Sequence, residues 1–253
     1  MLRSVIFLST PTSANGSLFR ALTAIGQGVY EPRPWVNELA STGRLEEITR
    51  SVPPREGCLI KHNAPERFNP DTCLADYRFV LNARDPRDMV CNQYAWQFSH
   101  PFPNETEAEA AARKQHVAEA GIDAFALRQD NSPYLDRFRA LAERITPTDR
   151  IFIGYAMYCL HFDEVTARLC AFLGVPAEAL GRKQRKMLNR ERVENLDTNR
   201  VWIGQIWPGA DRAPGRHRQE LRPETIRILT ERHAGFLDWL RAMDDPRVAA
   251  TYD

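Results

Sequence analysis

Small and hydroxyl-bearing residues follow the first apolar run of the chain. Val5–Leu8 is typical of a strand buried on both faces, and the apolar positions over Leu18–Ile25 repeat with the period of a helix. The loop between them is rich in small residues, which let backbone N–H groups approach a phosphate, and Ser13 and Ser17 add hydroxyl donors. This arrangement indicates an anion site, although strand–loop–helix is also common where no ligand binds. No Gly-Lys-Ser/Thr follows, so the loop is not a Walker A loop.

A second polar cluster follows the third predicted strand, Tyr77–Leu81. Pro86 opens a helix at a position that suits proline. Arg84 at the tip of the strand and Asn92 two turns into the helix could converge on one anion, because ligands of parallel sheets lie beyond the C-terminal ends of the strands. The structural alternative is that Asp85 caps the helix and that the Arg-Asp pair after it is solvated.

Together these segments resemble the cytosolic-type sulfotransferase family. The family's first loop, Pro-Lys/Arg-Ser-Gly-Thr-Thr-x-Leu, is similar to Pro11–Leu18. Its second signature, Arg-Asn/Asp-Pro-Lys/Arg-Asp with a Ser further on, is similar to Arg84–Asp88, with Asn92 standing where that Ser would be. Three later segments match the family in the same order: Ile151–Tyr155, Ala171–Pro176 and Arg212–Arg216.

The resemblance implies a fold, an activity and a cofactor. The fold would be a P-loop-like α/β fold. The reaction would be transfer of a sulfuryl group from 3′-phosphoadenosine 5′-phosphosulfate (PAPS) to a hydroxyl, or as second choice an amine, of a small-molecule, sugar or lipid acceptor. No metal is implied. In the family the first loop holds the 5′-phosphosulfate and the second signature holds the 3′-phosphate. Carried over by position, the residues that would hold the 5′-phosphosulfate are Thr12, Ser13, Ala14, Asn15, Gly16 and Ser17. Those that would hold the 3′-phosphate are Arg84, Asn92, Gly215 and Arg216, with Arg212 as an alternate. Tyr155 would contact the adenine.

The first loop departs from the family at two positions. Thr12 stands where a basic residue usually contacts the transferring sulfuryl group, so one electrostatic stabiliser of the bridging oxygen is missing. Ala14 replaces the usual Gly, and we expect Asn15-Gly16 to supply the positive φ instead. Either another cation serves the sulfuryl group, with Arg20 one turn into the helix as a candidate, or activity is reduced or absent.

A basic group for the acceptor is expected at the second predicted strand, Cys58–Ile60. The family often has Lys-x-His-x-Pro here, whereas this chain has Lys61-His62-Asn63 followed by Ala-Pro. We assign His62 as the base, because His is the usual proton acceptor at neutral pH. Asn63 occupies the strict position of the family His, and adjacent strand residues point to opposite faces, so His62 could instead be structural. Lys61 either contacts the cofactor or is a solvated strand end.

Residues 181–222 are basic and irregular in pattern, with eleven Lys/Arg against five Asp/Glu. They predict either a solvated face or a mobile lid over the cofactor, with Trp202 and Trp207 near the acceptor.

Composition sets the class of protein. The chain has 253 residues, 43% hydrophobic, and we expect a single α/β domain, 1–253, with a mainly parallel central sheet flanked by helices. A net charge of +1 gives no support for nucleic acid as a partner, although 30 of the 34 basic residues are Arg. The five cysteines form no CxxC, which excludes a recognisable zinc motif and favours a cytoplasmic location. No apolar run is long enough to span a membrane.

Finer elements are also predicted. Asn104 and Glu107 form a capping box, Ser132 starts a helix, and one final helix runs from Pro223 to Leu240. Two other functions stay open: an ATP-dependent kinase of P-loop-like fold, and a nucleotide- or partner-binding relative without activity, for which Thr12 is the main argument.

Overall fold

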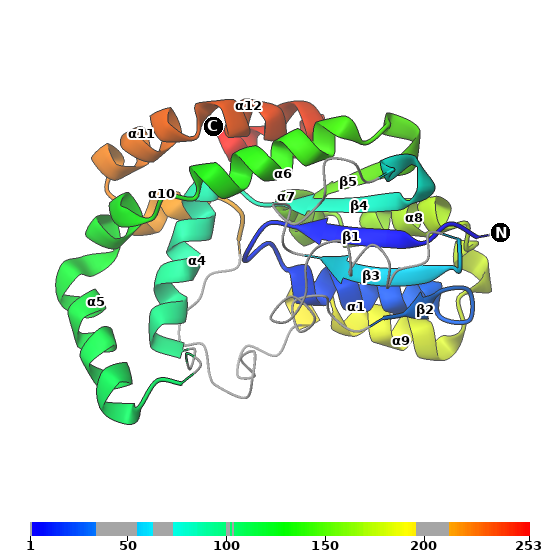
Figure 1. Cartoon of the computed structure of the whole chain (residues 1–253), viewed down its shortest axis with the longest axis horizontal. Helices are drawn as coiled ribbons and strands as arrows, with labels where there is room; N and C mark the ends of the chain where they lie inside the picture. The colour runs from blue at the N-terminus through cyan, green and yellow to red at the C-terminus, as the bar shows by residue number, and fades with distance from the viewer. Residues whose placement is uncertain (1, 34–54, 63–72, 100–101, 103, 196–212) are drawn as a thin grey trace.

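One parallel sheet organises the chain. The computed structural model describes residues 2–33, 55–62, 73–99, 102, 104–195 and 213–253. Five strands lie in the order β2-β3-β1-β4-β5, and every neighbouring pair is parallel (Figure 1). In that order the strands are Glu31–Pro32, Cys58–His62, Val5–Ser9, Arg78–Ala83 and Arg150–Gly154. The predicted α/β class and mainly parallel sheet are confirmed.

The central strand β1 explains why the strands read as continuous apolar runs. All five of its residues are buried, since helices cover both faces of the sheet. It pairs with β3, where Leu8 lies opposite His62, and with β4, where Ser9 lies opposite Asn82. The C-terminal ends of these strands therefore meet at one edge, where a ligand of a parallel sheet binds.

Helices fill the connections between strands. They are α1 (Asn15–Gly26), α4 (Pro86–Ser99), α5 (Glu107–Arg128), α6 (Ser132–Arg144), α7 (Tyr155–Leu160), α8 (Phe162–Leu173), α9 (Arg182–Arg190), α10 (His217–Glu220), α11 (Pro223–Arg232), α12 (Ala234–Met243) and α13 (Pro246–Ala249). Helix α1 packs against α8 and α9, and α6 packs against α12 on the other side of the sheet (Figure 1). Trp239 of α12 joins the layers, with its ring 5.9 Å from that of Phe138 and 5.4 Å from that of Phe152.

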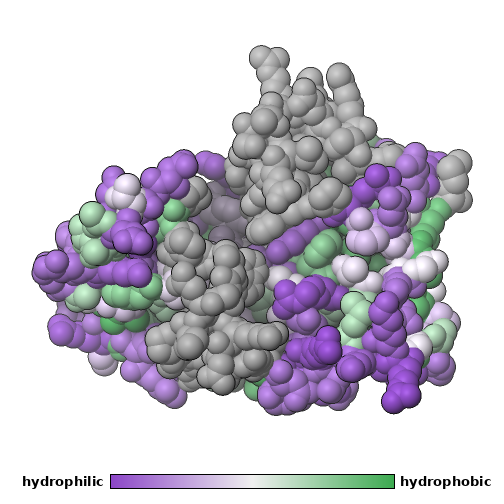
Figure 2. All heavy atoms as spheres, turned by 90° about the horizontal axis from the view of Figure 1, so that it is seen from below, coloured by the Kyte–Doolittle hydropathy of each residue, from purple (hydrophilic) through white to green (hydrophobic). Residues whose placement is uncertain are grey.

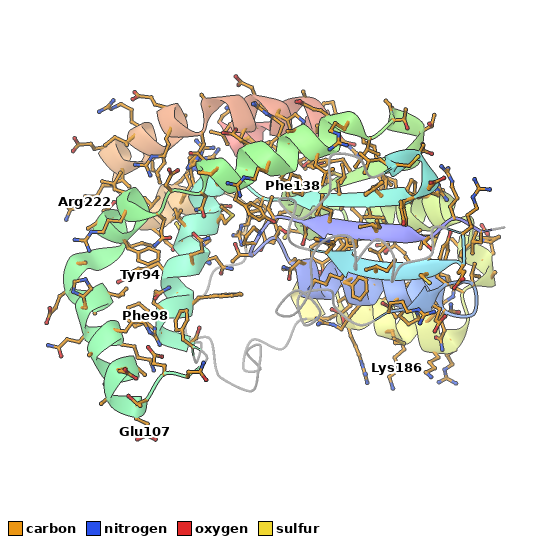
Figure 3. The ribbon with its side chains drawn as sticks, in the orientation of Figure 1. Tyr94, Phe98, Glu107, Phe138, Lys186 and Arg222 are labelled. Atoms are coloured by element: carbon orange, nitrogen blue, oxygen red, sulfur yellow. The ribbon has the colours of Figure 1, made fainter. Side chains whose placement is uncertain are left out.

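Helices α4 and α5 extend past the edge at which the strands end (Figure 1). Tyr94 and Phe98 lie one turn apart on α4 (Figure 3). The ring of Tyr94 is 5.1 Å from that of Phe98 and 5.5 Å from that of Phe125 in α5, so aromatic contacts hold the two helices together. Helix α4 begins at Pro86, as predicted. The predicted capping box is wrong by two residues, because Thr106 and Glu109 form it and Asn104 has a φ of 63°.

Two further predictions about helices are wrong. The final helix breaks at His233, whose φ of −108° and ψ of 16° separate α11 from α12. The basic stretch is not irregular over 182–190, where it forms α9. Leu188 is buried, and Gln184 donates to the carbonyl of Ala24 in α1. Lys186 points away from the helix into solvent (Figure 3), and the side that carries α9 is largely hydrophilic (Figure 2). This part of the stretch is therefore a solvated face. Trp202 and Trp207, on which the lid prediction depends, lie outside the described residues.

Candidate functional site at the carboxyl edge of the sheet

The loop between β1 and α1 has an unusual backbone. Thr12 and Ala14 have φ values of 58° and 60°, so two residues with side chains take the left-handed conformation that glycine prefers. The expectation that Asn15-Gly16 supplies the positive φ is wrong, since both residues lie inside α1. No side chain caps α1 and its first turn contains no acidic residue. The first N–H groups of the helix therefore stay available to an anion.

Asn82 of β4 anchors this loop to the sheet. Its Oδ1 lies 2.5 Å from Ser13 Oγ, its Nδ2 donates to the carbonyl of Ile153, and its carbonyl accepts from the N–H of Thr10. Ser13 Oγ also lies 2.6 Å from the carbonyl of Thr10. The hydroxyl of Ser13, which we expected to face a phosphate, is thus engaged within the protein. Its contribution to an anion would come from the backbone.

Arg84 is the most distinctive side chain of the site. It is 3% exposed, and its Nη1 donates to the carbonyl of Thr12 at 3.1 Å. Its Nε and Nη2 have no hydrogen-bond partner among the described residues, and neither has Thr12 Oγ1. Since a buried guanidinium is costly unless its N–H groups are bonded, these donors indicate a place for an anionic ligand.

The ring of Tyr155 packs against the guanidinium of Arg84. The guanidinium carbon lies 4.0 Å from the centre of the Tyr155 ring, a favourable cation–π geometry. Burial raises the pKa of the Tyr155 hydroxyl, so the side chain stays neutral. The sequence predicted an adenine contact for Tyr155. In the structure its ring packs against the guanidinium of Arg84.

Asp88 joins α4 to the segment before α10. It accepts from the N–H of Gly215 at 2.8 Å, from the N–H of His217 at 3.0 Å and from His217 Nδ1 at 2.7 Å. Arg84 Nη2 lies 3.7 Å from the same carboxylate. Burial by itself would raise the pKa of Asp88, but the His217 hydrogen bond and the Arg84 charge outweigh it and lower the pKa to about 2. Asp88 is therefore a carboxylate that only accepts hydrogen bonds.

The second predicted phosphate arginine lies next to this junction. Arg216 is 5% exposed and its Nη1 lies 3.5 Å from Asn92 Oδ1, so the two predicted residues meet. Glu220 contacts Arg216 Nη2 at 2.6 Å and holds the guanidinium from the other side. Arg212, the alternate, lies outside the described residues.

Lys61 lies beside the first loop. Its Nζ lies 3.5 Å from Asn15 Oδ1, and the side chain is buried, so the alternative of a solvated strand end is wrong. Burial, together with the neighbouring charge of Arg20, lowers the pKa of Lys61 to about 8. Lys61 therefore remains protonated at neutral pH, at a cost in stability.

Arg20, the other candidate cation, is held elsewhere. Its Nε and Nη2 donate to the two oxygens of Glu191 at 2.7 and 2.8 Å, a bidentate pair, and Nη2 also donates to Ser17 Oγ. The Tyr158 hydroxyl donates to the carbonyl of Glu191. The charge of Arg20 is thus balanced by a carboxylate, and its role is to tie α1 to the end of α9.

His62 is the last residue of β3 and is 3% exposed. Because the strand continues through His62, the pleat places Lys61 and His62 on opposite faces of the sheet. Lys61 contacts Asn15 of the first loop. Asn63, the alternative position, lies outside the described residues, so the assignment of His62 as the base stays a prediction.

The described residues contain no cluster of His, Cys, Asp and Glu that could hold a metal ion. Among the same residues, no helix combines the length and the apolar composition that a bilayer crossing requires.

The site at the carboxyl edge gathers donors and cations: the loop N–H groups, Lys61, Arg84, Arg216 and Asn92. This arrangement suits an anion with two negatively charged ends. Sequence reasoning missed Asp88 and His217, whose contact joins segments far apart in the chain.

Comparisons with known proteins place this fold. No family model and no curated protein matches the sequence. Among solved structures, mouse sulfotransferase SULT7A1 complexed with PAP aligns over 99% of this chain and 89% of its own, with a TM-score of 0.64 and 15% identity. Retinol dehydratase in complex with androsterone and the inactive cofactor PAP aligns over 94% of this chain and 82% of its own, with a TM-score of 0.59 and 15% identity. A sulfotransferase from Alicyclobacillus acidocaldarius aligns over 96% of both chains, with a TM-score of 0.52 and 13% identity.

These likenesses establish the sulfotransferase-like fold that the motifs predicted. At 13–15% identity they establish the fold alone, so activity and ligands rest on the residues of this chain.

Proposed function

We propose that this protein transfers a sulfuryl group from PAPS to a hydroxyl group of a small molecule. Buried Arg84 carries the proposal: its Nε and Nη2 have no hydrogen-bond partner among the described residues, and it lies beside a loop of left-handed backbone at the carboxyl edge of a parallel sheet. Solved neighbours of the same fold contain PAP, and one of them also contains androsterone.

The residues fit the two phosphates of this nucleotide. The N–H groups of the first loop and of the start of α1 would hold the 5′-phosphate end, because no side chain caps α1 and its first turn has no acidic residue. Arg84, Arg216 and Asn92 would hold the 3′-phosphate, since two guanidiniums match a phosphate dianion well. When bound, the cofactor supplies the sulfuryl group, and the protein supplies position and charge.

Lys61 would replace the basic residue that the first loop lacks at Thr12. Its ammonium group is buried and lies beside Asn15 of the same loop. A protonated lysine there stabilises negative charge that develops on the phosphate oxygen when a sulfuryl group leaves it. His62 stays our candidate for the base that accepts the proton of the acceptor hydroxyl.

Nucleotide binding provides the first test. Adenosine 3′,5′-bisphosphate should raise the melting temperature without Mg²⁺, and more than ATP does. Equal or greater stabilisation by ATP, dependent on Mg²⁺, would favour the kinase alternative instead.

Arg84→Ala should remove the preference for adenosine 3′,5′-bisphosphate over 5′-AMP, since the buried guanidinium is lost. Arg78→Ala is the matched control, because Arg78 lies at the opposite end of the same strand. A preference that survives Arg84→Ala would place the 3′-phosphate elsewhere.

Transfer of labelled sulfate, screened over alcohols, phenols, sugars and lipids, tests activity itself. His62→Ala should abolish most transfer and leave nucleotide binding intact. If Asn63→Ala does so and His62→Ala does not, the assignment of the base to His62 is wrong. Nucleotide binding without transfer to any acceptor would instead identify an inactive relative.

A further inference from the structure

The two residues that flank Arg216 are bonded to one buried carboxylate. The N–H groups of Gly215 and His217 reach the two different oxygens of Asp88, at 2.8 and 3.0 Å. Gly215 has a φ of 84°, a conformation that side-chain-bearing residues rarely adopt, and it turns its N–H toward Asp88. The backbone position of Arg216 is thus fixed by a residue of another helix.

His217 adds a third bond to the same carboxylate. Because ionised Asp88 only accepts hydrogen bonds, His217 Nδ1 must carry the proton and donate across the 2.7 Å separation. The imidazole is 0% exposed, and its Nε2 has no hydrogen-bond partner among the described residues. An unpaired buried nitrogen costs stability. An apolar ring would avoid that cost, so the useful property of histidine here is the Nδ1–H bond.

Asp88 also connects the two arginines. Its Oδ2, which accepts from Gly215, lies 3.7 Å from Arg84 Nη2. Arg84 comes from the β4–α4 turn, and Arg216 precedes α10. One carboxylate therefore contacts both the guanidinium of Arg84 and the backbone on either side of Arg216.

We propose that His217 is a positioning residue that acts through Asp88 to hold Arg216 at a fixed distance from Arg84, and so determines the selectivity for nucleotides that carry a 3′-phosphate. The inference rests on the proposed function, since it concerns the same nucleotide site. His217 itself need not touch the nucleotide. It makes the pair of arginines rigid before binding, so a 3′-phosphate is held without the entropic cost of ordering the segment.

The test compares affinities for adenosine 3′,5′-bisphosphate and 5′-AMP by calorimetry, using the full chain. His217→Phe keeps a ring of similar size and removes the Nδ1–H donor. We expect it to lower the ratio of the two affinities about tenfold, the usual effect of losing one charge-assisted hydrogen bond. Affinity for 5′-AMP should stay within about twofold. His217→Asn places an amide N–H at the position of Nδ1 along the side chain and should restore most of the ratio.

His233→Phe is the matched control. His233 is also buried, with Nδ1 3.4 Å from Ser132 Oγ and an Nε2 without a partner, but it makes no contact with Asp88. This control should leave the affinity ratio unchanged. In a double-mutant cycle, Arg216→Ala should lower the ratio strongly in the wild-type background and little in the His217→Phe background.

The outcomes separate the two claims. If the wild-type protein does not prefer adenosine 3′,5′-bisphosphate, the proposed function fails and this inference fails with it. If the wild type has the preference and His217→Phe keeps it in full, only the role of His217 is refuted. Should no variant at position 217 fold, amide hydrogen exchange of the wild type decides. Because the proposal requires a segment that is rigid before binding, the amides of Gly215 and His217 must be protected in the nucleotide-free protein, and rapid exchange of either amide refutes the proposal.

Discussion

Replacing Lys61 with methionine should stabilise the protein and impair its chemistry. The lysine is buried beside the first loop, where burial and the charge of Arg20 lower its pKa to about 8 from an ordinary 10.5. Methionine fills a similar volume without charge, so Lys61→Met removes the penalty for burying an ammonium group.

The magnitude follows from the pKa. Each tenfold change in proton affinity corresponds to about 1.4 kcal/mol, so a pKa of about 8 in place of 10.5 equals about 3 kcal/mol. Because the unfolded chain binds the proton more tightly, the penalty is complete below pH 8. It disappears as the pH rises from about 8 to 10.5. The unfolding free energy of Lys61→Met should exceed that of the wild type by about 3 kcal/mol at pH 7, and the two should converge near pH 10.5.

Urea denaturation of the nucleotide-free protein between pH 7 and 10.5 measures this difference. Lys186→Met is the control, because Lys186 is exposed on α9, and its stability should follow that of the wild type at every pH. Transfer activity should change in the opposite direction: wild-type activity declines above pH 8, and Lys61→Met loses about 100-fold or more. A destabilised Lys61→Met at pH 7, or a difference that does not vary with pH, would refute the reasoning.

Two other substitutions test neighbouring features. Gly154→Ala should lower the unfolding free energy by about 3 kcal/mol or more in a urea titration, because a Cβ there would lie 1.8 Å from Asp244 Oδ2. Gly235→Ala, whose Cβ would meet only the tip of a flexible arginine, should be close to neutral, and equal losses in both variants would contradict this reading. Arg20→Gln removes a charge that lowers the pKa of Lys61, so the decline of transfer rate at alkaline pH should move to higher pH. An unchanged pH–rate profile would mean that Lys61 does not control that decline.

Local patterns predicted the elements that depend on local residues. The apolar runs of β1 and β4 and the proline that opens α4 needed no knowledge of the rest of the chain. The two-residue strand β2 has too few residues to show a period. Helix α9 could not be predicted from an apolar pattern, because it has more charged than apolar residues. Leu188 is its one buried residue.

The site was predictable where its signal is contiguous in sequence. Arg84 and Asn92 lie within one turn-and-helix motif, and the structure brings Arg216 next to Asn92. The contact between Asp88 and His217 could not be predicted, because it joins residues 129 positions apart and His217 belongs to no local pattern. The strain at Thr12 was likewise hidden, because a β-branched residue is not expected at positive φ.

The position of β1 in the middle of a parallel sheet has a consequence for synthesis of the protein. Val5 pairs with Leu59 on one side and with Arg78 on the other, so β1 has no partner strand until β3 has been made and lacks its second partner until β4 follows. At about 5–20 residues per second, this wait lasts several seconds on the ribosome. During that time Val5–Ser9, a run of apolar residues buried in the finished fold, is exposed to solvent. The nascent chain therefore presents an early binding segment for chaperones that recognise extended apolar sequence, long before the nucleotide site can form.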